Sequence, residues 1–72
     1  MPDAIATSIT LNGDPYPLDG DTPLTALLEQ LKMRRGRVAV EINREIVPKV
    51  NYDVTIMRVG DHVEIINFVG GG

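Results

Sequence analysis

The residues with the clearest chemical potential are three consecutive glycines, Gly70, Gly71 and Gly72, at the end of the sequence. Because glycine has no Cβ, three in succession can thread a narrow channel in which larger residues would clash. At roughly 3.3 Å per extended residue, they carry a terminal carboxylate about 10 Å beyond a folded body. We therefore expect a flexible tail, residues 70–72, that delivers the Gly72 carboxylate to another protein's active site. The alternative is an end without function, since termini are commonly disordered.

Other reactive groups are scarce. The chain has no cysteine, which excludes a disulfide, a thiolate nucleophile and a sulfur-ligated metal site. His62 is the only histidine, and zinc sites usually need three or four protein ligands, so we interpret it as a solvated turn residue and expect no metal. The glycines before residue 70 are isolated and form no phosphate-cradling loop. We therefore expect the chain to bind no cofactor and to lack an independent catalytic site.

Charge and length narrow the class of partner. A chain of 72 residues supports one small domain, and a net charge of −3 argues against nucleic-acid binding and favours a basic partner surface. The arginines Arg34, Arg35 and Arg37 might suggest an anion site, but we interpret them as solvated charges that complement the end of a helix. No apolar run is long enough to span a bilayer. We expect a cytoplasmic protein that is monomeric when free.

The first half of the sequence predicts a hairpin followed by a helix. Residues 4–11 alternate in polarity as a half-buried strand does, residues 12–15 have turn chemistry, and residues 16–18 can pair back as a short strand. Thr22 is placed to cap a helix, and Gly36 to end it in a left-handed conformation. We expect three helical turns, whose apolar stripe is Leu24, Leu27, Leu28 and Leu31.

The second half returns to strands. Residues 37–43 alternate and predict a strand, residues 43–45 a turn, and residues 46–48 a short edge strand stopped by proline. Residues 51–56 form an expected irregular crossover, and residues 63–69 the last strand. In that strand Val63 and Ile65 share one face, so Glu64, Ile66 and Phe68 share the other, and Ile66 and Phe68 are expected to be exposed.

This order of elements predicts an α+β fold. A single amphipathic helix needs one face of a sheet to bury its leucines. We therefore expect the β-grasp, or ubiquitin-like, architecture: a mixed sheet of four to five strands packed on one helix, formed by one domain of residues 1–69.

Three segments carry a resemblance to a known family. LTALLEQL, residues 24–31, is similar to a leucine-rich helix of that family. VEINREIVP, residues 40–48, is similar to its strand, asparagine-containing turn and Val-Pro exit. GDHVEIINFVGGG, residues 60–72, is similar to its final turn, strand and glycine tail. Over essentially its full length the chain resembles the ThiS family, the sulfur-carrier proteins of thiamine biosynthesis.

The resemblance implies that the chain is a co-substrate and not an enzyme. A ThiF-like adenylyltransferase would use ATP to adenylate Gly72, while Gly70 and Gly71 thread its active site. A persulfide donor, such as a cysteine desulfurase, would then supply sulfur for a Gly72 thiocarboxylate, which a ThiG-like thiazole synthase would consume. Ile66 and Phe68, with Ala39 on the neighbouring strand, are the expected docking patch for the activating enzyme. In the alternative, Phe68 folds back over the sheet edge.

Two other functions fit the same sequence features. One is a MoaD-like carrier for molybdopterin synthesis or for another sulfur-transfer pathway, including tRNA, which keeps the chemistry and changes the acceptor. The segment from Ile46 to Pro48 and the triple glycine favour the thiamine pathway. The other is a ubiquitin-like binding module whose tail is never activated. Deleting residues 71–72 distinguishes the classes, because only a carrier would lose its function.

Overall fold

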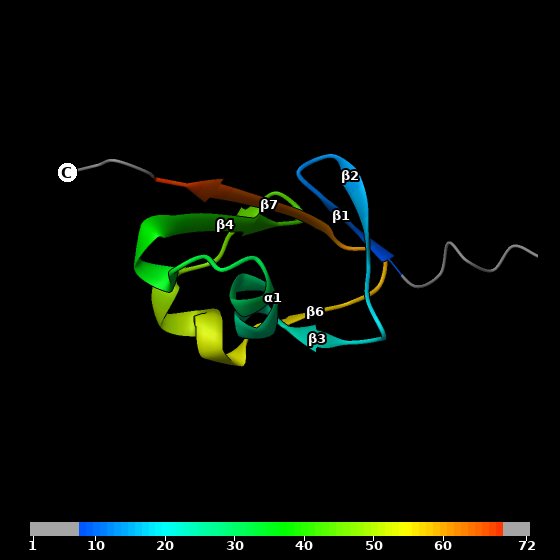
Figure 1. Ribbon diagram of the computed structural model, residues 1–72, viewed down its shortest axis with the longest axis horizontal. Coiled ribbons are helices and arrows are strands. Elements are labelled where there is room, and N and C mark those ends of the chain that lie inside the picture. The colour runs from blue at the N-terminus through cyan, green and yellow to red at the C-terminus, as the bar shows by residue number, and fades with distance from the viewer. Residues whose placement is uncertain (1–7, 69–72) are drawn as a thin grey trace, which may run out of the picture.

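The protein folds as one mixed sheet with a short helix packed across one face (Figure 1). The computed structural model describes residues 8–68; residues 1–7 and 69–72 lie outside it. The strand order in the main sheet is β2-β1-β7-β4-β5, and a second, two-stranded sheet joins β3 to β6. The strands are β1 (Ser8–Leu11), β2 (Asp14–Pro17), β3 (Thr22–Pro23), β4 (Val38–Ile42), β5 (Glu45–Ile46), β6 (Ile56–Met57) and β7 (His62–Asn67), and the helices are α1 (Leu24–Gln30) and the 3-10 helices η2 (Arg35–Arg37) and η3 (Lys49–Val54).

This arrangement is the β-grasp fold expected from the sequence. β1 and β7, the first and last strands, pair in parallel at the centre of the sheet, and the remaining pairs of the main sheet are antiparallel. The helix buries its leucines against the sheet, as the apolar stripe predicted. The predicted extent of the domain and its flexible tail stay predictions, because both ends of the chain lie outside residues 8–68.

Two tight hairpins set the strand register. Asn12 and Gly13 have φ values of 50° and 92°, the left-handed pair that a two-residue hairpin turn requires. Asn43 and Arg44, at 53° and 72°, do the same between β4 and β5. The turns are therefore shorter than predicted: β2 begins at Asp14 instead of Tyr16, and β5 at Glu45 instead of Ile46.

The prediction that Thr22 caps the start of the helix is wrong. Thr22 belongs to β3 and pairs with Met57 of β6, while its hydroxyl donates to the Gly20 carbonyl at 2.8 Å. The residue that precedes the helix is Pro23, and no side chain caps the helix there. Instead, the Leu24 N–H donates to the Thr55 carbonyl at 2.9 Å. Tertiary pairing with a distant strand has replaced the local cap.

The predicted end of the helix is also wrong. The helix stops at Gln30, after two turns instead of three. Lys32 takes a left-handed φ of 58°, and the Met33 N–H donates to the Leu28 carbonyl at 2.9 Å, which closes a Schellman-type C-cap. Lysine therefore occupies the position expected for glycine, and Gly36 lies further on, within η2 and without a positive φ.

The crossover between β5 and β7 is more regular than predicted. Residues 49–54 form η3, and residues 56–57 form β6, which the sequence did not indicate as a strand. η3 places Tyr52 in the core at 1% exposure, with its hydroxyl 3.3 Å from the Val38 carbonyl. The crossover thus seals the end of the sheet beside α1.

One core fills the space between the sheet and the helices. It is built almost entirely from aliphatic side chains, with Tyr52 as its aromatic member. Its buried members are Ile9, Leu18, Leu24, Leu27, Leu28, Val38, Val40, Tyr52, Met57, Val63 and Ile65. Among residues 8–68, no helix has the length and apolar character to cross a membrane.

The core predicts a large difference between two aliphatic truncations. Leu27 is 0% exposed and Val50 is 85% exposed. We expect Leu27→Ala to lower the free energy of unfolding by about 2–5 kcal/mol, because it removes buried surface and leaves a cavity. Val50→Ala, the matched control, should change it by less than about 0.5 kcal/mol. Urea unfolding followed by circular dichroism measures both, and equal losses would contradict the assigned core.

Candidate functional site

The strand that precedes the glycine tail in the sequence, β7, is the central strand of the main sheet. β7 pairs with β4 over five residue pairs, from Val38 opposite Asn67 to Ile42 opposite Val63. On its other side it pairs in parallel with the end of β1, where Thr10 lies opposite His62. A central strand with neighbours on both sides cannot shift without breaking two ladders. The start of β7 is therefore held from both sides, while β4 alone supplies a neighbouring strand as far as Asn67.

Asn12 continues the hydrogen bonding to β7 beyond the end of β1. The side-chain amide of Asn12 accepts from the Ile65 N–H at 2.8 Å and donates to the Ile65 carbonyl at 3.2 Å. The Asn12 N–H donates to the Val63 carbonyl at 2.9 Å. The amide group thus replaces the backbone partner that β1 no longer supplies, because β1 has already turned away at Leu11.

A second hairpin asparagine fixes the other end of β7. Asn43 donates its backbone N–H to the His62 carbonyl at 2.7 Å, and its side-chain oxygen accepts from the His62 N–H at 2.9 Å. Its amide nitrogen donates to the Asp61 carboxylate at 3.0 Å. The sequence indicated only turn chemistry at both asparagines, and a side-chain bond to a distant strand leaves no local signal. Nothing in the sequence pattern alone points to this role.

His62 is exposed, as expected, but it begins β7 instead of lying in the preceding turn. Asn43 engages its backbone groups. Across residues 8–68, no three histidine, cysteine or acidic residues are grouped in a way that could hold a metal ion.

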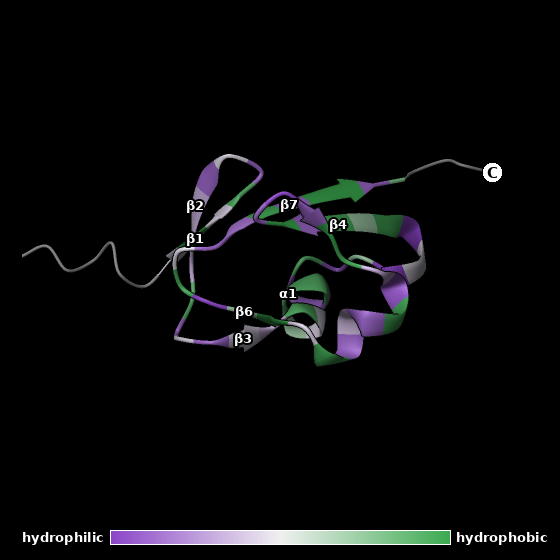
Figure 2. Cartoon of the chain, turned by 180° about the vertical axis from the view of Figure 1, so that it is seen from behind, coloured by the Kyte–Doolittle hydropathy of each residue, from purple (hydrophilic) through white to green (hydrophobic). Residues whose placement is uncertain are grey.

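The predicted docking residues lie together on the face of the sheet that turns away from α1. Ala39 of β4 is directly opposite Ile66 of β7, and Figure 2 shows the apolar stretch of β7 alongside β4. Ile66 is 59% exposed and Phe68 is 51% exposed. The Phe68 N–H donates to the Arg37 carbonyl at 2.7 Å, which holds Phe68 beside β4. The prediction that Ile66 and Phe68 are exposed is confirmed. This exposure favours a Phe68 side chain that is not folded back over the sheet edge. The docking role itself stays a prediction.

The same face carries residues that sequence patterns did not single out. Glu41 lies opposite Glu64 on one side and opposite Ile46 on the other, and Ile46 is 75% exposed. Alternation within β4 had placed Glu41 on the same face as Ala39, but its neighbours on β5 and β7 follow only from the strand register. This face is therefore apolar near the end of β7 and carries two carboxylates further from it, with Ile46 beside Glu41 on β5.

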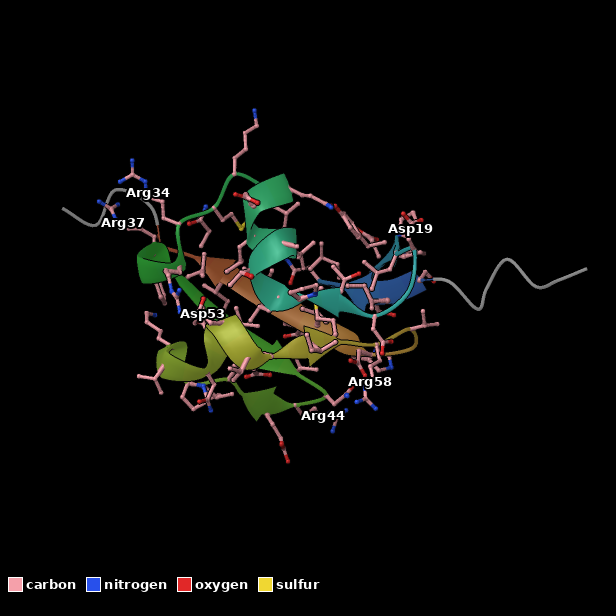
Figure 3. All side chains as sticks on the ribbon, turned by 90° about the horizontal axis from the view of Figure 1, so that it is seen from below. Asp19, Arg34, Arg37, Arg44, Asp53 and Arg58 are labelled. Carbon is pink, nitrogen blue, oxygen red and sulfur yellow. The ribbon has the colours of Figure 1, made fainter. Side chains whose placement is uncertain are left out.

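The arginines do not behave as the predicted helix-end cluster, because α1 has no basic residue in its last turn. Arg35 forms an ion pair with Asp53 at 2.8 Å, donates to the Lys49 carbonyl at 3.1 Å and stacks 5.7 Å from the Tyr52 ring centre. It therefore ties η2 to η3. Figure 3 shows Arg34 and Arg37 together at the periphery, at the end of the molecule where β7 leads.

The remaining predicted site residues, Gly70, Gly71 and Gly72, lie outside the described residues. Their threading and activation stay predictions. Residues 8–68 supply the platform from which such a tail would depart: a central strand, two asparagine amides that secure it, and an exposed face beside its last residues.

The chain matches the model of the ThiS family over residues 9–72. A crystal structure of the thiamine biosynthesis protein ThiS from Geobacter metallireducens is similar, with a TM-score of 0.76 and 38% sequence identity, covering 92% of this chain and 100% of that one. The sulfur carrier protein ThiS of Thermus thermophilus is 36% identical over 64 residues, which are 89% of this chain and 98% of that protein.

Longer relatives contain a comparable segment. A thiazole synthase of Magnetococcus marinus is 36% identical over 64 residues, which are 89% of this chain. The chain spans only about a fifth of the length of that protein, since the match covers 20% of it. The similarity therefore concerns one portion of that synthase.

The Asn12 amide predicts a local effect on β7. Asn12→Gly keeps the left-handed turn but removes both bonds to Ile65. We expect the free energy of unfolding to fall by about 1–3 kcal/mol, because the peptide group of Ile65 loses its partners. Hydrogen exchange read by NMR should show less protection at the Ile65 amide than the global loss explains.

Asn43→Gly serves as the matched control for that measurement. It also keeps a left-handed turn, but the amide that loses its side-chain acceptor is that of His62. Each variant should therefore expose a different amide of β7. Unchanged protection of Ile65 in Asn12→Gly would contradict the role given to that side chain.

Proposed function

The chain belongs to the ThiS family, and on that basis we propose that it is a sulfur carrier for thiazole formation in thiamine biosynthesis. The observation that carries the proposal is the family match, which extends through the last strand to residue 72. The glycine tail follows the central strand β7 in the sequence, after Phe68 and Val69. The names of the relatives in Geobacter and Thermus, together with that of the thiazole synthase, support this pathway over molybdopterin or tRNA thiolation.

The reacting group is the carboxylate of Gly72. A carboxylate resists attack because it is anionic and would have to expel oxide. One of its oxygens therefore attacks the α-phosphorus of ATP, pyrophosphate leaves, and an acyl-adenylate forms. The terminal sulfur of a persulfide then attacks the acyl carbon and AMP leaves. Cleavage of the resulting S–S bond by a thiol releases the Gly72 thiocarboxylate, whose sulfur is the nucleophile passed to the acceptor.

The partners divide this work among themselves. A ThiF-like adenylyltransferase binds ATP and performs the activation, a cysteine desulfurase or another persulfide source supplies sulfur, and a ThiG-like thiazole synthase consumes it. We place these steps in the cytoplasm, where ATP is available. The carrier binds no cofactor of its own and acts as a co-substrate.

The carrier contributes position and binding energy. Ordering Gly70 and Gly71 in an enzyme channel costs on the order of 1–2 kcal/mol per residue, towards the high end for glycine. That cost must be offset by contacts of the folded body. The exposed face formed by Ala39, Ile66 and Phe68 lies beside the end of β7 and is the surface best placed to supply them.

The proposal predicts a defined covalent product. After incubation with ATP, the cognate adenylating enzyme and a persulfide donor, intact-protein mass spectrometry should show one terminal oxygen replaced by sulfur. Deleting Gly72 should abolish the mass change, because the shortened tail no longer presents its carboxylate at the reaction centre. If the full-length chain formed neither adenylate nor thiocarboxylate with competent partners, a non-covalent ubiquitin-like binding module would be the better account.

The docking face predicts a kinetic effect of Phe68. We expect Phe68→Ala to raise the KM for the carrier in the adenylation reaction by about tenfold, because aromatic side chains buried at interfaces contribute strongly to binding. Val50→Ala, also an exposed apolar truncation but located in η3, should leave the KM unchanged. Pyrophosphate release measures both variants, and unchanged kinetics in Phe68→Ala would remove it from the docking face.

A further inference from the structure

Along the outer faces of β4 and β7, and just beyond their ends, four successive residue pairs change in chemistry in one direction. Two of the pairs follow from the strand register, one from the hydrogen bond between Phe68 and Arg37, and one from the bonds between Asn43 and His62. Starting at the end of β7, the pairs of this docking ladder are Arg37 with Phe68, Ala39 with Ile66, Glu41 with Glu64, and Asn43 with His62. The ladder therefore begins with a cation and an aromatic ring, passes through an apolar pair, and reaches two carboxylates.

The acidic pair breaks a local rule of sheet stability. Like charges placed directly opposite each other on one face of a sheet repel. Glu41 is half-buried and Glu64 is exposed, and among residues 8–68 neither forms an ion pair. They line a recess of about 360 Å³ together with Asn43, Arg44 and His62. A repulsion of this kind, placed next to exposed apolar side chains, is typical of a surface that is completed by a partner.

An apolar patch alone does not orient its partner. Hydrophobic contact is non-directional, whereas a tail that must enter a channel requires one rotational setting of the carrier. Arg37 and Glu41 are four residues apart along the chain, which separates their Cα atoms by about 13 Å in an extended strand. Opposite charges at that separation, on either side of an apolar centre, distinguish the correct setting from a reversed one, in which like charges would meet.

We propose that the adenylating enzyme recognises the order of charges along the docking ladder through complementary charges of its own. A basic side chain of the enzyme enters between Glu41 and Glu64, an apolar surface covers Ile66, and an acidic group beside the channel entrance pairs with Arg37. The net charge of −3 agrees with a partner that is basic at its main contact. This inference rests on the proposed carrier function and deepens it. It names the chemistry of the partner surface and the charge pattern that sets the orientation of the carrier on the enzyme.

Binding measured without ATP tests the acidic half of the ladder independently of any chemistry. Labelled carrier is titrated with the purified adenylating enzyme of the same organism at several salt concentrations. We expect the double substitution Glu41→Gln and Glu64→Gln to weaken binding about tenfold at low salt and to flatten its salt dependence. Its thermal midpoint should be unchanged or higher, because the substitution removes a repulsion. A loss of affinity therefore cannot be assigned to unfolding.

Glu45→Gln is the matched control. Glu45 is exposed on β5, but it lies opposite Ile42 and so on the other face from Glu41. It should bind with the affinity and salt dependence of the unsubstituted chain. Arg37→Gln tests the basic end, where we expect a loss of about threefold to tenfold that disappears at high salt. The triple substitution Arg37→Glu, Glu41→Arg and Glu64→Arg, which reverses the charge at both ends of the ladder, should bind more weakly than either Arg37→Gln or the double glutamine variant.

Two results would overturn the inference. If the double glutamine variant bound like Glu45→Gln at every salt concentration, the acidic pair would not be recognised. If Arg37→Gln had no effect, the ladder would have no polarity. Neither result would bear on the carrier proposal, because that proposal is tested by whether the unsubstituted chain forms a thiocarboxylate. Salt-dependent binding without any thiocarboxylate would overturn the carrier function and leave the recognition surface in place.

Discussion

The pairing of β7 between β1 and β4 is the constraint on which the rest of the structure depends. This strand closes the sheet that the N-terminal hairpin opened, and its inward residues Val63 and Ile65 enter the core. It is also the strand from which the glycine tail continues. A small domain buries only a modest share of its surface, so it has few elements that are not needed for its core. One strand therefore completes the core and also leads towards the tail for which we propose a reaction.

The two faces of that strand serve different purposes because the side-chain period of a strand is two. One face is fixed by packing, and its apolar residues cannot change without loss of stability. The other face, with Glu64 and Ile66, is exposed and can hold side chains that local rules disfavour, including a direct opposition of two carboxylates. The residues that stabilise the core and those that we propose for recognition thus lie on opposite faces of one strand.

The asparagine turns show how a short sheet is secured in a chain without cysteine. Asn12 and Asn43 both occupy left-handed turn positions, and both extend their amides to the backbone of β7. A side-chain amide carries the same donor and acceptor pair as a peptide group, so it can continue a ladder after the strand has ended. This explains how β1, with four residues, can still support β7 as far as Ile65.

Much of the fold is determined by the sequence alone, since alternation, turn chemistry and the leucine stripe are local signals. They predicted the two hairpins, the helix, the strand from residue 37, and the inward and outward faces of β7. The prediction of a glycine tail likewise needed no tertiary information, because it rests on three consecutive residues without side chains. The predicted helix boundaries were wrong. Thr22 pairs with the distant strand β6 instead of capping the helix, and a local C-cap at Lys32 ends the helix before Gly36. Only the tertiary structure decided the partners of Asn12, the opposition of Glu41 and Glu64, and the proximity of Arg37 to Phe68. These contacts join residues far apart in the chain, and their geometry is set by strand register, which no short stretch of sequence contains.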